Sequence, residues 1–254
     1  MNSFSNRRIL RTWWPLAASW LLMTTELPLI SAVIARLPEA EINLAAWGVV
    51  FSVAIIIQSP STMLLAASTA LSRDWNAYQK VRHFMLFIGV TLTSLHIVIV
   101  FTPLYDFIAT SLLGIPDAIY QPARIGLMIM VPWSWGTAYR RFQQGVLIRF
   151  DHSRTVIWGS VIRVSTDATI LLIGYWIGSI AGIVVGTTGI IAGVLSEDIY
   201  TAVRVRPVLQ NKLRQAVSST PTLTTARFLR FYIPLALTVL MTLIVQPLVL
   251  SLIH

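Results

Sequence analysis

Long apolar runs alternate with short polar connections along almost the whole chain. A helix that crosses the hydrocarbon core of a bilayer needs about 20 largely apolar residues. Seven segments satisfy this requirement: Trp13–Leu37, Leu44–Leu71, Phe84–Pro103, Pro122–Ile148, Thr155–Gly178, Ile180–Val203 and Phe228–Ile253. The pattern predicts an all-α polytopic transmembrane helical bundle.

The connections between these segments add local detail. Only Gly178 and a serine separate the fifth and sixth segments, which predicts a tight helical hairpin. In the third-to-fourth connection, Leu104–Ile115 ends near a Gly-Ile-Pro turn, and we expect a short interfacial helix there. The first apolar run contains Pro15, Glu26 and Pro28 and is too long and too polar for a cleaved signal peptide, so it predicts a retained helix.

Basic residues are concentrated in alternate connections. The N-terminal arm and the second-to-third, fourth-to-fifth and sixth-to-seventh connections carry most of them: Arg7, Arg8, Arg11, Arg73, Lys80, Arg82, Arg149, Arg154, Arg204, Arg206, Lys212, Arg214 and Arg227. The connections on the other side are poor in Lys and Arg. Because cytoplasmic loops carry an excess of these residues, we expect a multi-pass protein of the inner (plasma) membrane with a cytoplasmic N-terminus.

The composition indicates that lipid is the solvent for much of the surface. Hydrophobic residues make up 56% of the 254 residues and charged residues only 11%, and the mean hydropathy is +0.73. An ordinary soluble domain carries about 25% charged residues, so these values argue against a water-soluble enzyme. The formal charge of +9 comes largely from residues between the apolar segments, so we expect no nucleic-acid partner. With no Cys and four scattered His, we expect no metal site. We expect no cofactor other than Na⁺ or H⁺ as a coupling ion.

The seventh segment repeats the first. At an offset of 219 residues, ten positions match, with Arg8, Leu10, Arg11, Pro15, Leu16, Ala17, Leu21, Pro28, Leu29 and Ile34 recurring as Arg227, Leu229, Arg230, Pro234, Leu235, Ala236, Leu240, Pro247, Leu248 and Ile253. Chance similarity between two apolar helices would explain the Leu matches but explains the Pro and Arg matches poorly. We therefore expect the seventh helix to begin a second copy of a six-helix unit, the two copies being parallel repeats.

This repeat predicts three parts of the chain. They are an N-terminal six-helix transmembrane bundle over residues 1–206, a cytoplasmic basic linker over 207–226, and the first helix of a second bundle over 227–254. The interpretation predicts one half of a duplicated protein, truncated after the first helix of its second repeat.

Ionisable residues inside apolar segments cost about 2.5–3.5 kcal/mol each on insertion scales and are candidates for function. Glu26 lies about 20 Å along the first helix, between Pro15 and Pro28, where free backbone carbonyls are expected. It suits a proton or a sodium ion; the alternative is a carboxylate bonded to a neighbouring helix without a role in transport. Arg163 and Asp167 stand four residues apart on one helix face, and we expect a structural pair, with participation in a polar cavity as the alternative.

Further polar groups lie near the ends of the predicted helices. Arg141 is expected to snorkel toward the membrane surface, whereas Arg140 is either an anchor of this kind or a cavity residue. Glu197 and Asp198 close the sixth helix, and we expect them to face the basic residues that follow, with gating as the alternative. Candidates to interrupt the second helix and line a cavity are Gln58, Ser59 and Pro60.

Small and aromatic residues complete the pattern. A glycine stripe on the sixth helix predicts close helix packing: Gly178, Gly182, Gly186, Gly189 and Gly193. Five tryptophans fall near predicted interfaces and are expected to form a membrane belt: Trp13, Trp14, Trp47, Trp75 and Trp176.

A family resemblance rests on residues at fixed spacing. These are Trp13-Trp14-Pro15-Leu16-Ala17 with Pro28, Arg140 and Gly145 followed by Arg163, and Gly182, Gly186, Ala192, Gly193 and Glu197. Together with the parallel repeat, they resemble the superfamily of MATE (multidrug and toxic compound extrusion) transporters and oligosaccharide flippases (MOP superfamily). Within it, the sequence looks most like the progressive ankylosis protein branch.

The resemblance implies a V-shaped pair of six-helix bundles around a central cavity. It also implies alternating access, an ion gradient as the driving force, and export or flipping toward the outside. Ankylosis-like members are associated with organic and phosphate-bearing anions, which would suit Arg140 and Arg163 as cavity cations. MATE members instead export organic cations and use an acidic residue on the first helix.

We therefore expect a secondary active transporter for MATE-like efflux of organic solutes, anions among them, with Na⁺ or H⁺ as the coupling ion. The candidates for substrate or ion binding are Glu26, Gln58, Arg140, Arg163, Asp167 and Glu197, and those for helix kinks are Pro15, Pro28 and Pro60. Expected partners are membrane lipids, a small-molecule solute and a complementary second half. The alternatives are a lipid-linked oligosaccharide flippase and a non-transporting scaffold subunit.

Overall fold

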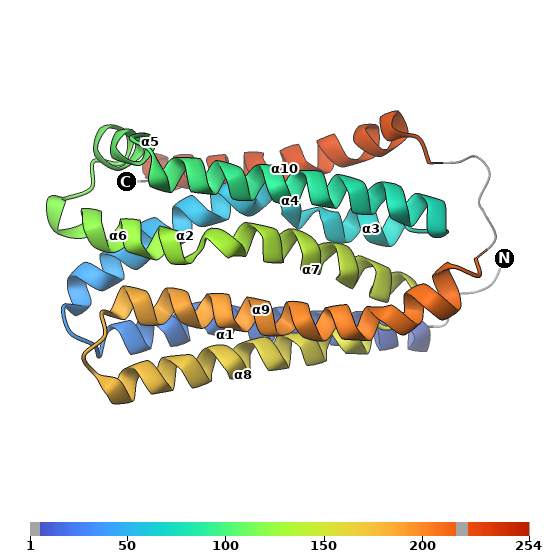
Figure 1. Ribbon diagram of the computed structural model, residues 1–254, viewed down its shortest axis with the longest axis horizontal. Helices are drawn as coiled ribbons and strands as arrows, with labels where there is room; N and C mark the ends of the chain where they lie inside the picture. The colour runs from blue at the N-terminus through green and yellow to red at the C-terminus, as the bar shows by residue number, and fades with distance from the viewer. Residues whose placement is uncertain (1–5, 217–222, 254) are drawn as a thin grey trace.

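The computed structural model describes residues 6–216 and 223–253, and over these ranges the chain forms a bundle of long helices that run alternately in opposite directions (Figure 1). The bounds are α1 Asn6–Ile34, α2 Ala40–Thr62, α3 Leu64–Leu71, α4 Trp75–Phe101, α5 Leu104–Asp106, α6 Asp117–Ile129, α7 Val131–Arg149, α8 Ser153–Ile177, α9 Gly182–Val208 and α10 Thr225–Ile253. Two π-helical segments follow α5 and α9, over Phe107–Leu112 and Leu209–Leu213. The predicted all-α helical bundle is confirmed.

Each predicted span corresponds to one long helix or to two helices in line. The second span is α2 followed by α3, with a break at Met63, and the fourth is α6 followed by α7, with a break at Met130. Within the described ranges, five helical stretches are long and apolar enough to cross a membrane, and they cover the first, second, third, fifth and sixth predicted spans. The fourth is more polar because α7 carries Arg140, Arg141, Gln143 and Gln144.

The hairpin predicted between the fifth and sixth spans is formed by α8 and α9. Gly178 ends α8 in the left-handed region, at a φ of 66°, which residues with a side chain rarely adopt. α9 then packs closely on α1 and α8. A Cβ atom at Gly186 would lie 2.9 Å from Ile34, and one at Gly193 would lie 3.0 Å from the backbone oxygen of Arg163. The predicted glycine packing is confirmed on α9, whereas Gly178 belongs to the turn.

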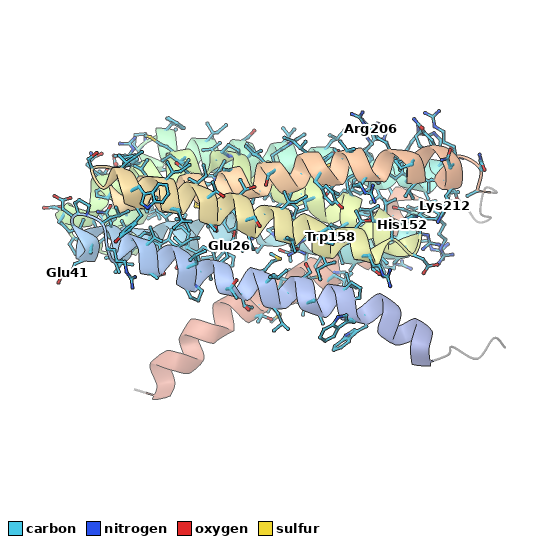
Figure 2. The ribbon with its side chains drawn as sticks, turned by 90° about the horizontal axis from the view of Figure 1, so that it is seen from below. Glu26, Glu41, His152, Trp158, Arg206 and Lys212 are labelled. Carbon is cyan, nitrogen blue, oxygen red and sulfur yellow. The ribbon has the colours of Figure 1, made fainter. Side chains whose placement is uncertain are left out.

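The connections gather by charge at the two ends of the bundle. Figure 2 shows His152, Arg206 and Lys212 toward one end and Glu41 at the opposite end. The α4–α6 connection holds α5 and its π-helical extension, where a short interfacial helix is expected. The charge asymmetry of the sequence is therefore an asymmetry between the ends, and the assignment of one end to the cytoplasm stays a prediction.

The tryptophans expected at the membrane interface do not all lie there. Trp13, Trp14 and Trp176 are exposed, but Trp47 is buried, and its ring centroid lies 5.5 Å from that of Phe51. The belt prediction is therefore wrong for Trp47, because α2 turns this side chain into the core of the bundle.

α10 lies against α2 and α4. The rings of Phe228 and Tyr232 pack on Phe84 with centroid distances of 4.4 and 4.8 Å, and the Tyr232 hydroxyl donates to the Pro60 carbonyl. Figure 2 shows α1 and α10 on the same face of the bundle, inclined to each other. The division at 206 and 226, and the role of α10 as the start of a second unit, stay predictions.

Candidate functional site

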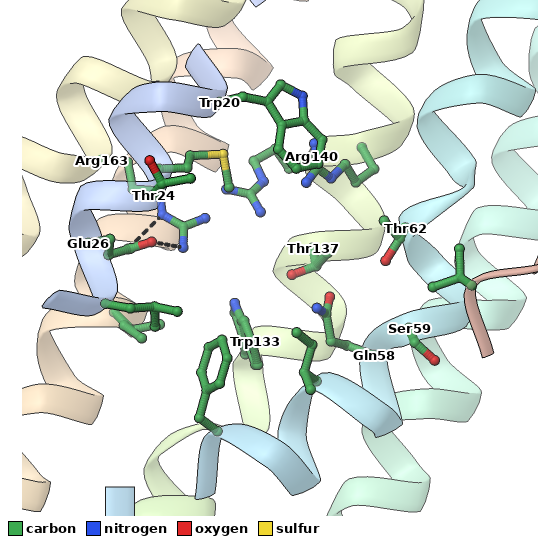
Figure 3. A pocket seen from close by; sticks show the side chains of 17 residues that line it. Trp20, Thr24, Glu26, Gln58, Ser59, Thr62, Trp133, Thr137, Arg140 and Arg163 are labelled. Carbon is green, nitrogen blue, oxygen red and sulfur yellow. Dashed lines mark hydrogen bonds and ion pairs between the residues drawn. The ribbon is translucent and has the colours of Figure 1, made fainter. Parts of the chain in front are cut away.

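A cavity of about 330 Å³ lies between the middle parts of the helices (Figure 3). Most of its lining comes from α1, α2 and α7, with single residues from α8, α9 and α10. Four predicted binding residues line it: Glu26, Gln58, Arg140 and Arg163. Ligand pockets typically measure about 300–1,000 Å³, so the cavity is large enough for one small organic molecule.

Arg163 of α8 and Glu26 of α1 form a bidentate ion pair at the edge of the cavity. The Nε–Oε1 distance is 2.9 Å and the Nη2–Oε2 distance is 2.7 Å, and both side chains are buried. Paired contacts between a planar guanidinium and a carboxylate are the strong form of charged hydrogen bond. The structure thus has Glu26 bonded to a neighbouring helix, and its role in binding a coupling ion stays a prediction.

The predicted pairing of Arg163 with Asp167 is wrong. Asp167 is fully buried, and neither of its carboxylate oxygens has a hydrogen-bond partner among the described residues. It faces α9, where a Cβ atom at Gly189 would lie 2.5 Å from Oδ1. Spacing of four residues places two side chains on one helix face, but Arg163 extends toward α1, where Glu26 offers both of its oxygens.

Glu197 of α9 connects this ion pair to α7. Arg140 donates from Nη1 to Glu197 Oε2, Gln144 donates to Oε1 at 3.0 Å, and Nη1 of Arg163 lies 3.9 Å from Oε2. Glu197 therefore points into the bundle, and the expectation that it faces the basic residues after the sixth span is wrong. Glu26, Arg163, Glu197 and Arg140 form a charge network of alternating sign across α1, α8, α9 and α7.

Many polar atoms in and around the cavity have no hydrogen-bond partner among the described residues. They are Gln58 Oε1, Trp133 Nε1, Thr137 Oγ1, Arg140 Nε, Arg141 Nε, Gln144 Oε1 and Arg163 Nη1. An unpaired buried polar group costs about 1–3 kcal/mol, so their concentration indicates groups that meet water or a ligand. Within the described part of the chain, no group of three or more His, Cys, Asp or Glu side chains could hold a metal ion.

The three predicted kink prolines each remove one backbone hydrogen bond from a helix. α1 nevertheless continues past Pro15 and Pro28, and α2 past Pro60. Because Pro28 has no N–H, the carbonyl of Thr24 lacks its helical donor, and Thr24 lines the cavity. Pro60 likewise leaves the carbonyl of Ile56 without its helical donor, and this carbonyl accepts a hydrogen bond from the hydroxyl of Ser59. Pro28 therefore leaves an additional acceptor on a turn that borders the cavity, and the kinks themselves stay predictions.

Arg141 also lines the cavity, which the sequence interpretation missed. Its Cζ lies 5.7 Å from the ring centroid of Trp20 on α1, so the predicted snorkelling toward the membrane surface is wrong. Consecutive residues of a helix point about 100° apart, so Arg140 bonds to α9 while Arg141 faces α1. The sequence signal that could have identified Arg141 is its position next to Arg140. A helix that is packed on several sides turns both of two adjacent residues toward other helices.

The arrangement of helices resembles solved structures of transporters. An inward-facing MATE family transporter of the MOP superfamily matches with a TM-score of 0.68 and 16% identity, covering 87% of this chain and 51% of that one. An outward-facing MATE family transporter matches with a TM-score of 0.69 and 19% identity, covering 91% of this chain and 52% of that one. A MOP superfamily transporter from Pyrococcus furiosus matches with a TM-score of 0.64 and 17% identity, again covering 91% of this chain and 52% of that one.

The described bundle has the fold of a MOP superfamily transporter. The sequence itself matches no family model and no curated protein. The chain spans about half the length of the transporters that it matches. Its apolar spans and this fold make it a multi-pass membrane protein. The fold that the resemblance implied is confirmed, and membership of the superfamily, the progressive ankylosis branch and the truncation stay predictions.

Proposed function

We propose that the chain forms half of a secondary active transporter that exports small organic solutes, with a preference for anions. The observation that carries this proposal is a cavity lined by three arginines and one carboxylate inside a transporter fold. Side chains of this kind at membrane depth are costly to insert and occur where they face a cavity or a pathway. The apolar walls of the same cavity suit the body of an organic molecule.

The charge balance supports an anionic solute. Arg140, Arg141 and Arg163 line the cavity, and Glu26 is its only acidic lining residue among those described. For the Pyrococcus furiosus transporter, a reversed polarity of the binding pocket has been taken to suggest a different function. An arginine-rich cavity in the present chain suits anions rather than the organic cations expected of MATE transporters.

The mechanism that we propose is alternating access with an ion as the driving force. Val239 of α10 reaches the cavity, so a second half continuing from this face would close it from the other side. H⁺ or Na⁺ would act at the buried carboxylates Glu26 and Asp167. An ion at Glu26 must compete with the guanidinium of Arg163, and this competition would link ion binding to the contact between α1 and α8.

A lipid-linked oligosaccharide flippase remains the second candidate, because an arginine-rich cavity also suits the phosphates of a lipid carrier. It differs from the first candidate in its substrate, which enters from the lipid. The third candidate is a non-transporting scaffold subunit. A scaffold would not depend on the charged side chains of the cavity.

Transport by the purified chain in liposomes tests the proposal. The mass of the assembly is measured by light scattering, and uptake of radiolabelled organic anions and of a lipid-linked glycan is followed under H⁺ and Na⁺ gradients. We expect gradient-driven uptake of a soluble anion by assemblies of more than one chain and none by monomers. Transport by monomers would contradict the need for a second half, and transport of the lipid-linked glycan alone would favour the flippase.

Variants of the ion pair separate a transporter from a scaffold. Replacing both partners, as Glu26→Gln with Arg163→Gln, leaves no unpaired charge and should abolish uptake while the protein stays folded. The exposed Arg204→Gln is the matched control and should transport normally. Full uptake by the double variant would show that the charges do not take part in transport.

A further inference from the structure

The three arginines of the cavity differ in their partners. Arg163 is held by both oxygens of Glu26, and Arg140 is held by Glu197. Among the described residues, Arg141 has no carboxylate within 4.0 Å and no acceptor for a hydrogen bond, and its Nε is buried. The positive charge that the described part of the protein leaves uncompensated at the cavity therefore lies on Arg141.

The surroundings of Arg141 keep this charge available. Arg141 makes a cation–π contact with Trp20, whose ring centroid lies 5.7 Å from Cζ and whose side chain is 60% exposed. A cation–π contact of this kind holds the guanidinium in place and leaves its N–H donors free. Asp167 and Asp198 do not line the cavity, so neither supplies a carboxylate there.

The cavity is polarised along its length. Figure 3 shows Trp20, Arg140 and Arg163 at one end, with Trp133 and Gln58 toward the other. Apolar side chains from α1, α2, α9 and α10 complete the lining. The charged end lies on the side of the basic connections, because α7 runs from Trp133 toward Arg149 at that end of the bundle.

We propose that Arg141, held by Trp20, is the residue that binds the charged group of the solute, and that the solute is an amphipathic organic monoanion. Its aromatic or aliphatic body would extend toward Trp133, and Gln58 and Thr137 would offer it hydrogen bonds. This inference rests on the proposed function and makes it specific. Arg140 and Arg163, already neutralised inside the charge network, position α7 and α8 and add no net charge to the site.

One uncompensated arginine explains why a monoanion is favoured. A second anionic group would bring a charge that no guanidinium compensates, because Glu26 already neutralises Arg163 and Glu197 already neutralises Arg140. Displacing either carboxylate would leave it buried without its partner, which is strongly unfavourable. A single carboxylate or sulfonate meets Arg141 without breaking any contact of the network.

Equilibrium binding of three probes of nearly equal size tests the assignment. Radiolabelled 2-naphthoate, 2-naphthylmethanol and 2-naphthylmethylammonium carry the same ring system with a negative, a neutral and a positive group. We expect the purified chain in nanodiscs to bind 2-naphthoate at least about tenfold more tightly than the other two, as a charge-assisted hydrogen bond implies. Equal affinity for the three probes would overturn the inference.

Variants of Arg141 then test whether this residue causes the preference for the anionic probe. Arg141→Gln should reduce 2-naphthoate binding to the level of 2-naphthylmethanol, and Arg141→Lys should retain part of the preference. Arg204→Gln is the control and should bind 2-naphthoate like the unmodified chain. Tryptophan fluorescence on heating shows whether each variant is folded. If Arg141→Gln does not fold, the assignment is decided by whether Arg141→Lys has a weaker preference for 2-naphthoate than the unmodified chain.

The results separate this inference from the proposed function. If Arg141→Gln keeps its preference for the anion, the assignment to Arg141 is overturned while anion transport stands. If binding follows the expected pattern but no assembly transports an anion, the site is supported and the transport proposal fails.

Discussion

The ion pair of Glu26 and Arg163 joins α1 to α8 through two contacts between buried groups. A buried pair of this kind contributes little net stability, because both charges lose their hydration. Removing one partner is far more costly, since the other charge is then buried without compensation. The pair is therefore best understood as a positional constraint on α1, whose remaining contacts are largely with α8 and α9.

Glu26→Gln should lower stability by about 3–5 kcal/mol, because Arg163 then loses its counter-charge. The double variant Glu26→Gln with Arg163→Gln should recover much of the loss. Heating in detergent, followed by tryptophan fluorescence, measures both effects. The exposed Glu41→Gln serves as a control and should change the midpoint little. A double variant as unstable as the single one would contradict the pairing.

Among the helices, α7 has a central place, in contact with α2, α3, α4 and α9. Its approach to α3 depends on Gly145, where a Cβ atom would lie 2.6 Å from the backbone oxygen of Leu65 and 2.9 Å from the backbone nitrogen of Thr69. Backbone atoms of a packed helix cannot move aside individually. A methyl group at Gly145 therefore has to separate the two helices.

Gly145→Ala should destabilise the protein by about 1–3 kcal/mol through this overpacking. Gly48 of α2 is the matched control, because a Cβ atom there meets nothing within 4 Å. Gly48→Ala should leave stability unchanged or raise it by up to about 1 kcal/mol, since Ala is the better helix former. Thermal unfolding of the two variants measures the contrast, and equal midpoints would contradict the close contact of α7 with α3.

At the scale of the whole molecule, the ends of the bundle differ in charge. Arg206 and Lys212 lie toward one end and Glu41 at the other (Figure 2). The positive-inside rule assigns the basic end to the cytoplasm. The charged end of the cavity would then face the cytoplasm, which is the side from which an exporter takes up its solute.

Cysteine labelling in intact cells measures this orientation, and the chain has no Cys that would interfere. A membrane-impermeant maleimide added outside should label Glu41→Cys and should leave Lys212→Cys unlabelled until the cells are permeabilised, because both side chains are exposed at opposite ends of the bundle. The reverse pattern would place the basic end outside and contradict the predicted topology.

The sequence by itself determined the helical class, five of the seven predicted spans, the α8–α9 hairpin and the glycine packing of α9. These features depend on hydrophobicity and residue size along single helices, and such properties are visible in a linear pattern. The fold of the bundle agreed with the resemblance that the spaced motifs indicated.

Only the tertiary structure decided the partners of the polar groups. Arg163 bonds to Glu26 rather than Asp167, Glu197 to Arg140, and Arg141 lies over Trp20. In each case the partner is on another helix, and helix rotation and neighbour order determine which side chains meet. Spacing within one helix identifies the face that a residue occupies, but it does not identify the helix that this face contacts.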